Sequence, residues 1–200
     1  MGRKSRGIEP RQTIGIYCEG ESECQYFNML RQKYNAKNVR SQKLDIKSLN
    51  KSGKNLIIAA NQHKKANKQS KAYVVFDRDI DNINKSIDEI RECQRLAERY
   101  NITILFSSIN FEIWILMHYE PVMRSYTRRE LYRKLSGEKY FDTDYEKFKG
   151  DSYRPYLFDK VTKAKANAEK LYKVNPKMEK DDPYTNIHRY LGEIFKVSVF

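Results

Sequence analysis

The sequence predicts an α/β fold built on a mostly parallel sheet. Segments typical of strands and of helices alternate over residues 12–120, which is the pattern of a sheet flanked by helices. One strand segment, AYVVF at residues 72–76, is a continuous apolar run, as expected of a strand that is buried on both faces. We therefore expect helices on both sides of the sheet.

The first elements are identified from composition and apolar spacing. Residues 13–18 (TIGIYC) are apolar and β-branched, which favours a strand. Apolar side chains then recur at helical spacing over residues 26–34, with Ser22 as the expected N-cap. Residues 39–46 alternate loosely and are predicted to form a second strand. Residues 54–66 carry an apolar stripe and an outward lysine face, as surface helices do.

Three more elements complete the predicted core after the apolar strand at residues 72–76. Residues 83–100 have the apolar spacing of a long helix, and residues 102–106 form a short apolar run typical of a strand. The segment FEIWILMHY at residues 111–119 is a very apolar helix candidate. Strand and helix therefore alternate three times or more before Pro121.

The second half of the chain has a different pattern. Residues 128–135, 161–174 and 184–195 are predicted to be helices around a stretch rich in tyrosine and lysine, with Thr185-Asn186 capping the last helix. We expect a flexible basic arm at 1–11, an α/β core at 12–120, and a helical extension at 121–200 that packs on the core. We do not expect this extension to fold as an independent domain.

Composition points to a basic protein that binds polyanions. The chain has 200 residues, with 39 Lys plus Arg against 26 Asp plus Glu, a net charge of +13, and this surplus favours partners such as nucleic acid or an acidic surface. Three cysteines without a CxxC spacing argue against a zinc ribbon and fit a reducing cytoplasm. No apolar run approaches the length of a membrane span or signal peptide, so we expect no membrane partner.

Three acidic residues follow two predicted strands. Glu19 comes after the first strand, and Asp77 and Asp79 come after the most apolar one. Ligand sites of open α/β sheets gather at the carboxyl ends of the strands, and carboxylates without histidine or cysteine suit Mg²⁺ or Mn²⁺. The sequence therefore predicts a metal site there. The alternative is that these acids are ordinary solvated turn residues.

At these residues the sequence resembles known families. CEGESE at residues 18–23 and VFDRD at residues 75–79 look like the two halves of a TOPRIM metal site. SSINFEIW at residues 107–114, followed by His118-Tyr119, resembles a characteristic block of the RloB family, and the likeness extends over residues 13–195. Two departures stand out: Ile109 and Asn110 replace a proline common in that block, and Arg78 lies between the two aspartates.

The resemblance implies a TOPRIM-like nuclease of prokaryotic anti-phage defence. Family members commonly act by abortive infection with an ABC-type or SMC-like ATPase as partner. Carried over to this chain, Glu19, Asp77 and Asp79 would be metal ligands, and Glu23 and Glu112 would be further acids at the site. Glu23 is accordingly added to the predicted metal set, although both residues also suit the first turn of a helix.

Basic residues supply the other candidate contacts. Lys147 is our candidate for a contact with the scissile phosphate, and the alternative is one more surface lysine. A cluster before the strand at residues 72–76 is a candidate nucleic-acid surface or a solvated helix face: Lys64, Lys65, Lys68 and Lys71. Tyrosines between residues 126 and 156 can stack on bases or attach the extension to the core. We expect His118 to be structural.

The sequence therefore predicts a Mg²⁺- or Mn²⁺-dependent endonuclease as the leading hypothesis. A non-catalytic nucleic-acid-binding or adaptor subunit is the second, because it explains the charge equally well. Phosphoryl or nucleotidyl transfer is a weaker third. The chain has no GxxxxGK[ST] pattern, so we expect the ATPase to be a separate protein. DNA and RNA, including tRNA, stay open as substrates, as does a homo-oligomeric state.

Overall fold

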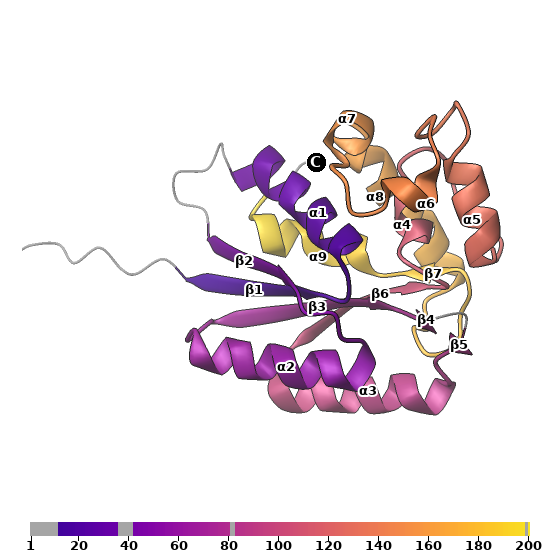
Figure 1. The fold of residues 1–200 in the computed structure, drawn as a ribbon. Helices are drawn as coiled ribbons and strands as arrows, with labels where there is room; N and C mark the ends of the chain where they lie inside the picture. Colours follow the sequence, from indigo (N-terminus) through magenta and orange to yellow (C-terminus); the bar gives the residue numbers. More distant parts are fainter. Residues whose placement is uncertain (1–11, 36–41, 81–82, 199) are drawn as a thin grey trace, which may run out of the picture.

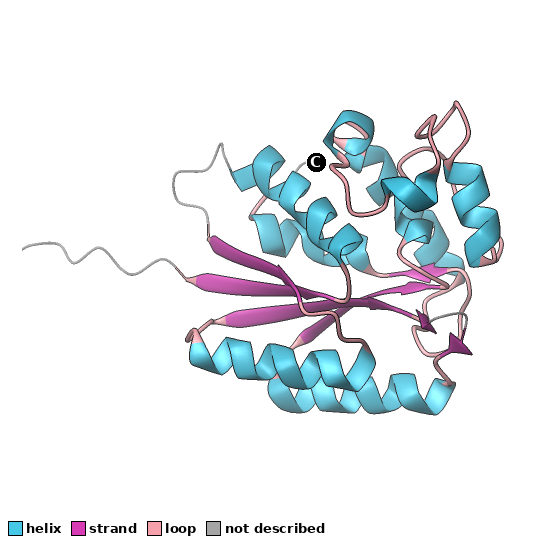
Figure 2. Cartoon of the chain, viewed as in Figure 1, coloured by secondary structure: helices cyan, strands magenta, loops and turns pink. Residues whose placement is uncertain are grey.

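A five-stranded sheet forms the centre of the protein, as the computed structural model shows for residues 12–35, 42–80, 83–198 and 200 (Figures 1 and 2). The strand order is β2-β1-β3-β6-β7. Neighbours among the first four strands are parallel, whereas β7 runs antiparallel to β6. The strand bounds are β1 (Thr13–Cys18), β2 (Lys43–Ser48), β3 (Lys71–Asp77), β6 (Thr103–Ser108) and β7 (Tyr184–Thr185). This architecture confirms the predicted α/β fold class with a mostly parallel sheet.

Helices cover both faces of the sheet (Figure 1). On one face lie α2 (Gly53–Ala66) and α3 (Ile87–Tyr100). The opposite face is covered by α1 (Glu21–Leu30), which continues into a π-helical turn at Arg31–Asn35, and by α9 (Ile187–Phe195). The remaining helices lie over the same face and beyond it: α4 (Glu112–Leu116), α5 (Arg128–Leu135), α6 (Tyr145–Phe148), α7 (Arg154–Leu157) and α8 (Val161–Val174). None of the helices that the structure describes is long and apolar enough to cross a bilayer.

The apolar sequence of β3 explains its central position. Alternate side chains of a strand point to opposite faces, and here both faces are buried from Ala72 to Asp77. Val74 and Phe76 pack into the apolar cluster beneath α2 and α3, whereas Tyr73 and Val75 pack into the cluster on the opposite face. Burial on both faces is therefore the reason that the strand is an unbroken apolar run.

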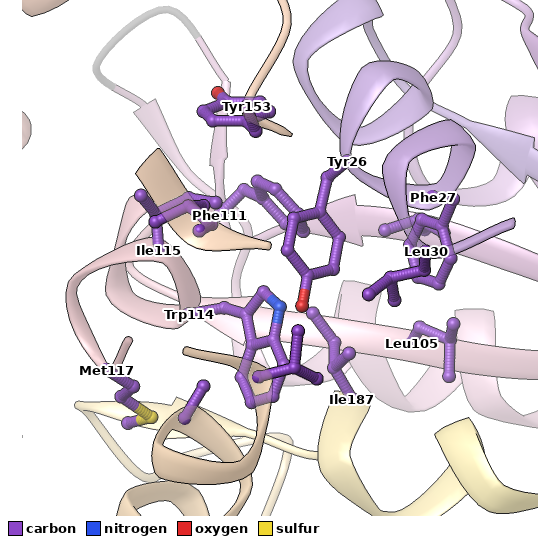
Figure 3. Close-up of a cluster of buried hydrophobic side chains, with 14 of the residues drawn as sticks. Tyr26, Phe27, Leu30, Leu105, Phe111, Trp114, Ile115, Met117, Tyr153 and Ile187 are labelled. Atoms are coloured by element: carbon purple, nitrogen blue, oxygen red, sulfur yellow. The ribbon is translucent and has the colours of Figure 1, made fainter. Parts of the chain in front are cut away.

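The helical second half shares its apolar core with the sheet. Trp114, fully buried, meets Tyr26 from α1 edge to face, with ring centroids 6.1 Å apart (Figure 3). Tyr145 and Tyr153 are also fully buried in this cluster, and their hydroxyl oxygens lie 3.1 Å apart. These two tyrosines attach residues of the second half to the core, so they are not available to stack on bases.

The last strand is held by a side chain from the following helix cap. The Asn186 side chain accepts a hydrogen bond from Phe106 N–H at 2.8 Å and donates to Ile104 O at 3.0 Å. Asn186 is also the N-cap of α9, as the sequence predicted. It ties β6 to a segment 80 residues later in the chain.

Several predicted boundaries were wrong for local reasons. The helix predicted from residue 83 begins at Ile87, because Ser86 Oγ caps it by accepting from Glu89 N–H at 3.2 Å. A two-stranded antiparallel ribbon, β4 (Asp79–Ile80) and β5 (Ile83–Asn84), precedes it. The first helix is capped at Gly20 rather than Ser22. Residues 39–41 and the predicted basic arm at 1–11 lie outside the described residues.

Candidate functional site

Glu19 and Asp77 lie where the direction of chain winding reverses. From β1 the chain passes through α1 to β2 at one side, and then through α2 on the other face to β3. As a result β1 and β3 are neighbours, and Glu19 N–H donates to Val75 O at 2.9 Å. Ligand sites of open α/β sheets form at such switch points, outside the carboxyl ends of the strands. The predicted convergence of these two acids is therefore a property of the topology.

Asp77 is a buried carboxylate with one unused oxygen. Its side chain accepts from Phe111 N–H at 3.3 Å through Oδ2, whereas Oδ1 meets no donor among the described residues. Burial, followed by the nearby Glu19 and Glu23 carboxylates, raises the pKa of Asp77 well above its ordinary value. A buried acceptor without a donor is costly, so this oxygen calls for a positively charged or hydrogen-bonding ligand.

Glu19 is held in place by a polar side chain and by a buried lysine. Its Oε2 accepts from Ser52 Oγ at 2.7 Å. Burial raises the pKa of Glu19, and Lys85 and Ser52 oppose that rise. The Lys85 ammonium donates to Asp77 O at 2.6 Å, and its residue is only 7% exposed. Lys85 therefore places a positive charge beside both acids.

Glu23 and Glu112 extend the acidic group. Both residues are buried, Glu23 on α1 and Glu112 at the start of α4. Glu23 Oε2 accepts from Gly20 N–H at 3.2 Å, and burial, with Glu112 and Glu19 nearby, raises the pKa of Glu23 to about 7. Four carboxyl groups thus influence one another at this edge of the sheet.

A second lysine, Lys149, reaches this acidic group through Glu112. Its Nζ lies 3.1 Å from Glu112 Oε1 and donates to Tyr132 Oη at 2.6 Å. Burial lowers the pKa of Lys149, but Glu112 and Tyr132 outweigh that effect and raise it. Lys147, the lysine singled out from the sequence, has a side chain that is 86% exposed and pairs with Asp144 at 3.4 Å. The structure does not bring Lys147 to the acids.

The predicted basic cluster lies at the opposite edge of the sheet. Lys71 begins β3 and Asp77 ends it, so the two are about 20 Å apart at the usual rise of a strand. Lys64 donates to Tyr100 O at 3.1 Å and to Asn101 O at 2.8 Å, and Lys71 pairs with Glu193. Lys65 and Lys68 are exposed beside them. A nucleic-acid contact there stays a prediction and is separate from the acidic site.

The donor set is suited to a hard cation. Among the side chains that the structure describes, no three His, Cys, Asp or Glu residues form a ready-made metal group. Asp79, the third predicted ligand, begins β4, but its side chain lies outside the described residues. Asn110 follows β6 and directly precedes Phe111, whose N–H donates to Asp77. Its residue is 1% exposed, and neither its amide oxygen nor its amide nitrogen has a hydrogen-bond partner in the described part of the chain. Carboxylate and amide oxygens that lack partners fit Mg²⁺ or Mn²⁺.

His118 is a neutral structural residue, as the sequence analysis expected. Its Nε2 lies 3.1 Å from Tyr26 Oη, and its Nδ1 lies 3.0 Å from Trp114 O. A ring that donates through Nδ1 to the carbonyl and accepts at Nε2 from the tyrosine satisfies both nitrogens without a positive charge. Burial lowers the pKa of His118 to about 3. The same contacts leave it no role as a general base.

This lowered pKa predicts an acid-sensitive core. The unfolded chain gains a proton at His118 below the ordinary pKa of 6.5, whereas the folded protein does not until pH falls to about 3. The contribution of His118 to the unfolding free energy is therefore fully present above pH 6.5. It falls progressively below that pH, and about 2 kcal/mol of it is lost at pH 5. Urea unfolding at pH 7 and pH 5 of the wild type and His118→Gln measures this difference.

The comparison with the variant is needed because lowering the pH changes the stability contribution of the buried acids in the opposite direction. Raised pKa values of Asp77 and Glu23 make the folded state gain protons, and hence relative stability, as pH falls. The contribution of His118 is therefore the amount by which the wild type loses more unfolding free energy between pH 7 and pH 5 than His118→Gln does. Equal losses in the two proteins would contradict a neutral, buried His118.

Comparisons with known proteins give one match. The model of a family described as RloB-like protein matches residues 14–194, which includes β1 from Ile14 onward, the acids, and α9 up to Ile194. No curated protein and no solved structure matches the chain. The matched region covers every strand of the sheet together with the helices of the second half.

Proposed function

The chain belongs to the RloB-like protein family, and we propose that it is a metal-dependent nuclease whose centre lies at the carboxyl ends of β1 and β3. The observation that carries this proposal is the buried Asp77 beside Glu19, with an oxygen that no described donor reaches. The protein has a net charge of +13 and gathers carboxylates at one point. Its basic surface is suited to bind a polyanion, and the carboxylates are suited to bind a metal cation beside it. Phosphodiester hydrolysis is the chemistry that such a pair supports.

The side chains have distinct roles in this proposal. Glu19, Asp77 and the predicted third ligand Asp79 would hold Mg²⁺ or Mn²⁺. When bound, the cation supplies charge for the phosphate oxygens and acidifies a water molecule. Ser52 fixes the Glu19 carboxylate through its 2.7 Å hydrogen bond. Lys85 limits repulsion between Glu19 and Asp77.

Glu112 and Lys149 form the second part of the proposed site. Their ion pair joins α4 to the residue that follows α6. Because Glu112 is buried, its charge needs a close partner, and Lys149 supplies one. We propose that this pair positions groups at the metal centre and is not itself part of the metal's ligand set.

The biological role is proposed from the family resemblance. We infer a toxic effector of a prokaryotic anti-phage system, cytoplasmic and controlled by an ATPase encoded with it. A nuclease that attacks cellular nucleic acid must be silent until infection, which is why a separate regulator is part of the proposal. The competing function is a nucleic-acid-binding adaptor without catalysis, which the net charge of +13 also favours.

Glu19→Gln tests the proposed function. We expect cleavage to fall at least about 100-fold, because removal of one ligand charge weakens both cation binding and catalysis. The assay follows plasmid DNA, single-stranded DNA and total tRNA with Mg²⁺, Mn²⁺ or EDTA, with and without any ATPase that is encoded beside the protein. Glu92→Gln, which removes an exposed carboxylate of α3 that pairs with Lys54, is the matched control.

Each outcome separates the two functions. Metal-dependent cleavage that is lost in Glu19→Gln and kept in Glu92→Gln supports the nuclease and identifies its substrate. If both variants and the wild type bind nucleic acid but none cuts it under any condition, the adaptor function replaces the nuclease. Cleavage that persists in Glu19→Gln would mean that the catalytic centre lies elsewhere.

A further inference from the structure

A basic pocket opens beside the acidic site, between α5 and the segment around α6. It has a volume of about 720 Å³. Its charged lining consists of four cations and two carboxylates: Arg128, Arg129, Arg133, Lys149, Asp144 and Glu146. Lys149 is already paired with Glu112, so the three arginines against two carboxylates leave an excess of one positive charge (3 − 2). An open pocket with this balance favours an anionic ligand.

Lys149 connects this pocket to the acids. It lines the pocket and also lies 3.1 Å from Glu112 Oε1. Arg128, the first residue of α5, lines the same pocket. A ligand in the pocket would therefore lie next to the proposed metal centre. In Figure 1, α5 and α6 lie over the end of the sheet toward which the parallel strands point.

A second hollow continues the basic surface along α5. Its volume is about 260 Å³, and Arg133 lines both hollows. Arg124, which lines the second one, lies with its guanidinium carbon 3.8 Å from the centre of the Tyr126 ring. Two adjoining hollows that share an arginine suit an extended chain of negative charges better than a single small anion.

We propose that these two hollows bind the phosphate backbone of the nucleic-acid strand whose neighbouring phosphodiester is presented to Glu19 and Asp77. This inference rests on the proposed function, since it names the surface that guides the substrate to that site. Arginine suits the task because its planar fork of donors matches phosphate oxygens. Backbone contacts of this kind set position and affinity without reading sequence.

The position of the hollows distinguishes them from the lysine cluster predicted from sequence. Lys64 and Lys71 are engaged with carbonyl oxygens or with Glu193. They also lie at the opposite edge of the sheet, about 20 Å from Asp77 along β3. Arg129 and Arg133 are exposed on α5 at the edge that carries the acids. Substrate contacts should therefore be found on α5.

The experiment compares two charge-matched double variants. Arg129→Gln with Arg133→Gln removes two pocket cations, and Arg95→Gln with Arg99→Gln removes two cations from α3 on the opposite face of the sheet. Binding of labelled single-stranded DNA and of single-stranded RNA of the same sequence is measured in EDTA over a range of salt concentrations. Circular dichroism and melting confirm that both variants are folded.

We expect the pocket variant to bind at least one of the two probes about tenfold more weakly or worse. The slope of log affinity against log salt should fall in magnitude by about 1.4, because each phosphate of a single strand that the protein no longer neutralises changes it by about 0.7. The α3 variant should keep a slope close to that of the wild type. Equal weakening in both variants, or wild-type binding in the pocket variant for both probes, would overturn the inference.

The EDTA assay keeps this test separate from the nuclease test. Binding without metal requires no cleavage, so it does not depend on Glu19 or Asp77 acting as ligands. If the pocket variant loses binding while the wild type cuts no substrate, the pocket is supported and the nuclease function fails. If the pocket variant binds normally while Glu19→Gln loses cleavage, the nuclease stands and the pocket assignment is overturned.

Discussion

Asp77→Asn is expected to abolish metal-dependent cleavage and, at the same time, to raise the melting temperature of the metal-free protein. The loss of activity should be at least about 100-fold, because the proposed central ligand no longer carries a charge. The gain in stability should be a few degrees, since about 1 kcal/mol corresponds to about 2–4 °C at this chain length. Cleavage assays and thermal melts in EDTA measure the two effects.

The sign of the stability change follows from the environment of Asp77. Burial and the nearby Glu19 and Glu23 carboxylates raise its pKa well above the ordinary value. An acid whose pKa is raised on folding destabilises the fold once pH exceeds the unfolded pKa, and the penalty grows until pH reaches the folded pKa. Asparagine removes the charge, and its amide oxygen can still accept the hydrogen bond from Phe111 N–H.

Asp159→Asn is the matched control for this variant. The Asp159 side chain is 93% exposed and pairs with Lys33 at 3.5 Å, away from the acidic site. It should keep wild-type cleavage and a melting temperature close to that of the wild type, since exposed ion pairs contribute little. A lower melting temperature of Asp77→Asn than of the wild type in EDTA would contradict the inference that the acids repel one another in the metal-free protein. A variant that still cuts would contradict the ligand assignment.

Trp114→Ala is expected to cost about 3–5 kcal/mol of unfolding free energy. The side chain is fully buried, and its ring lies 6.1 Å from Tyr26 and 5.2 Å from His118, centroid to centroid. Removing it opens a cavity where α1, α4 and the second half of the chain meet (Figure 3). Urea unfolding with a fixed m-value measures the loss.

Met123→Ala serves as the control for Trp114→Ala. Met123 is 54% exposed, so its truncation should change the unfolding free energy by no more than about 0.5 kcal/mol. A cost below about 1 kcal/mol for Trp114→Ala would mean that the cluster does not support the fold. Two separate unfolding transitions in either protein would mean that the second half of the chain folds as an independent unit.

The elements with strong apolar patterns were predictable from the sequence. The bounds of β1, α5 and α8 agree with those predicted, because each is marked by a clear apolar period or a polar boundary. The two-residue strand β7 (Tyr184–Thr185) was assigned to the last helix instead. So short a segment carries no periodic signal, and its strand geometry comes from pairing with β6.

The acids of the candidate site were more predictable than its cations. Glu19 and Asp77 follow buried strands, so the topology alone brings them to one edge. Lys85 and Lys149 reach that edge only through tertiary packing, and in the sequence they are two among 39 lysines and arginines. Lys147 lies on the four-residue helix α6 and faces solvent, whereas Lys149, the residue after that helix, turns toward Glu112. So short a helix has no apolar period in the sequence that would show which lysine turns inward.

The hydrogen bonds of Asn186 also set the order in which the protein can mature on the ribosome. Its partners on β6, Phe106 and Ile104, are made 80 and 82 residues earlier. While that stretch is being translated, the backbone groups of Ile104 and Phe106 have only water as a partner on that edge, and the sheet cannot reach its final form. A nascent chain shorter than residue 186 therefore lacks the completed sheet edge beside the acids. The edge formed by β6 and β7 is therefore completed only after residue 186 has been made.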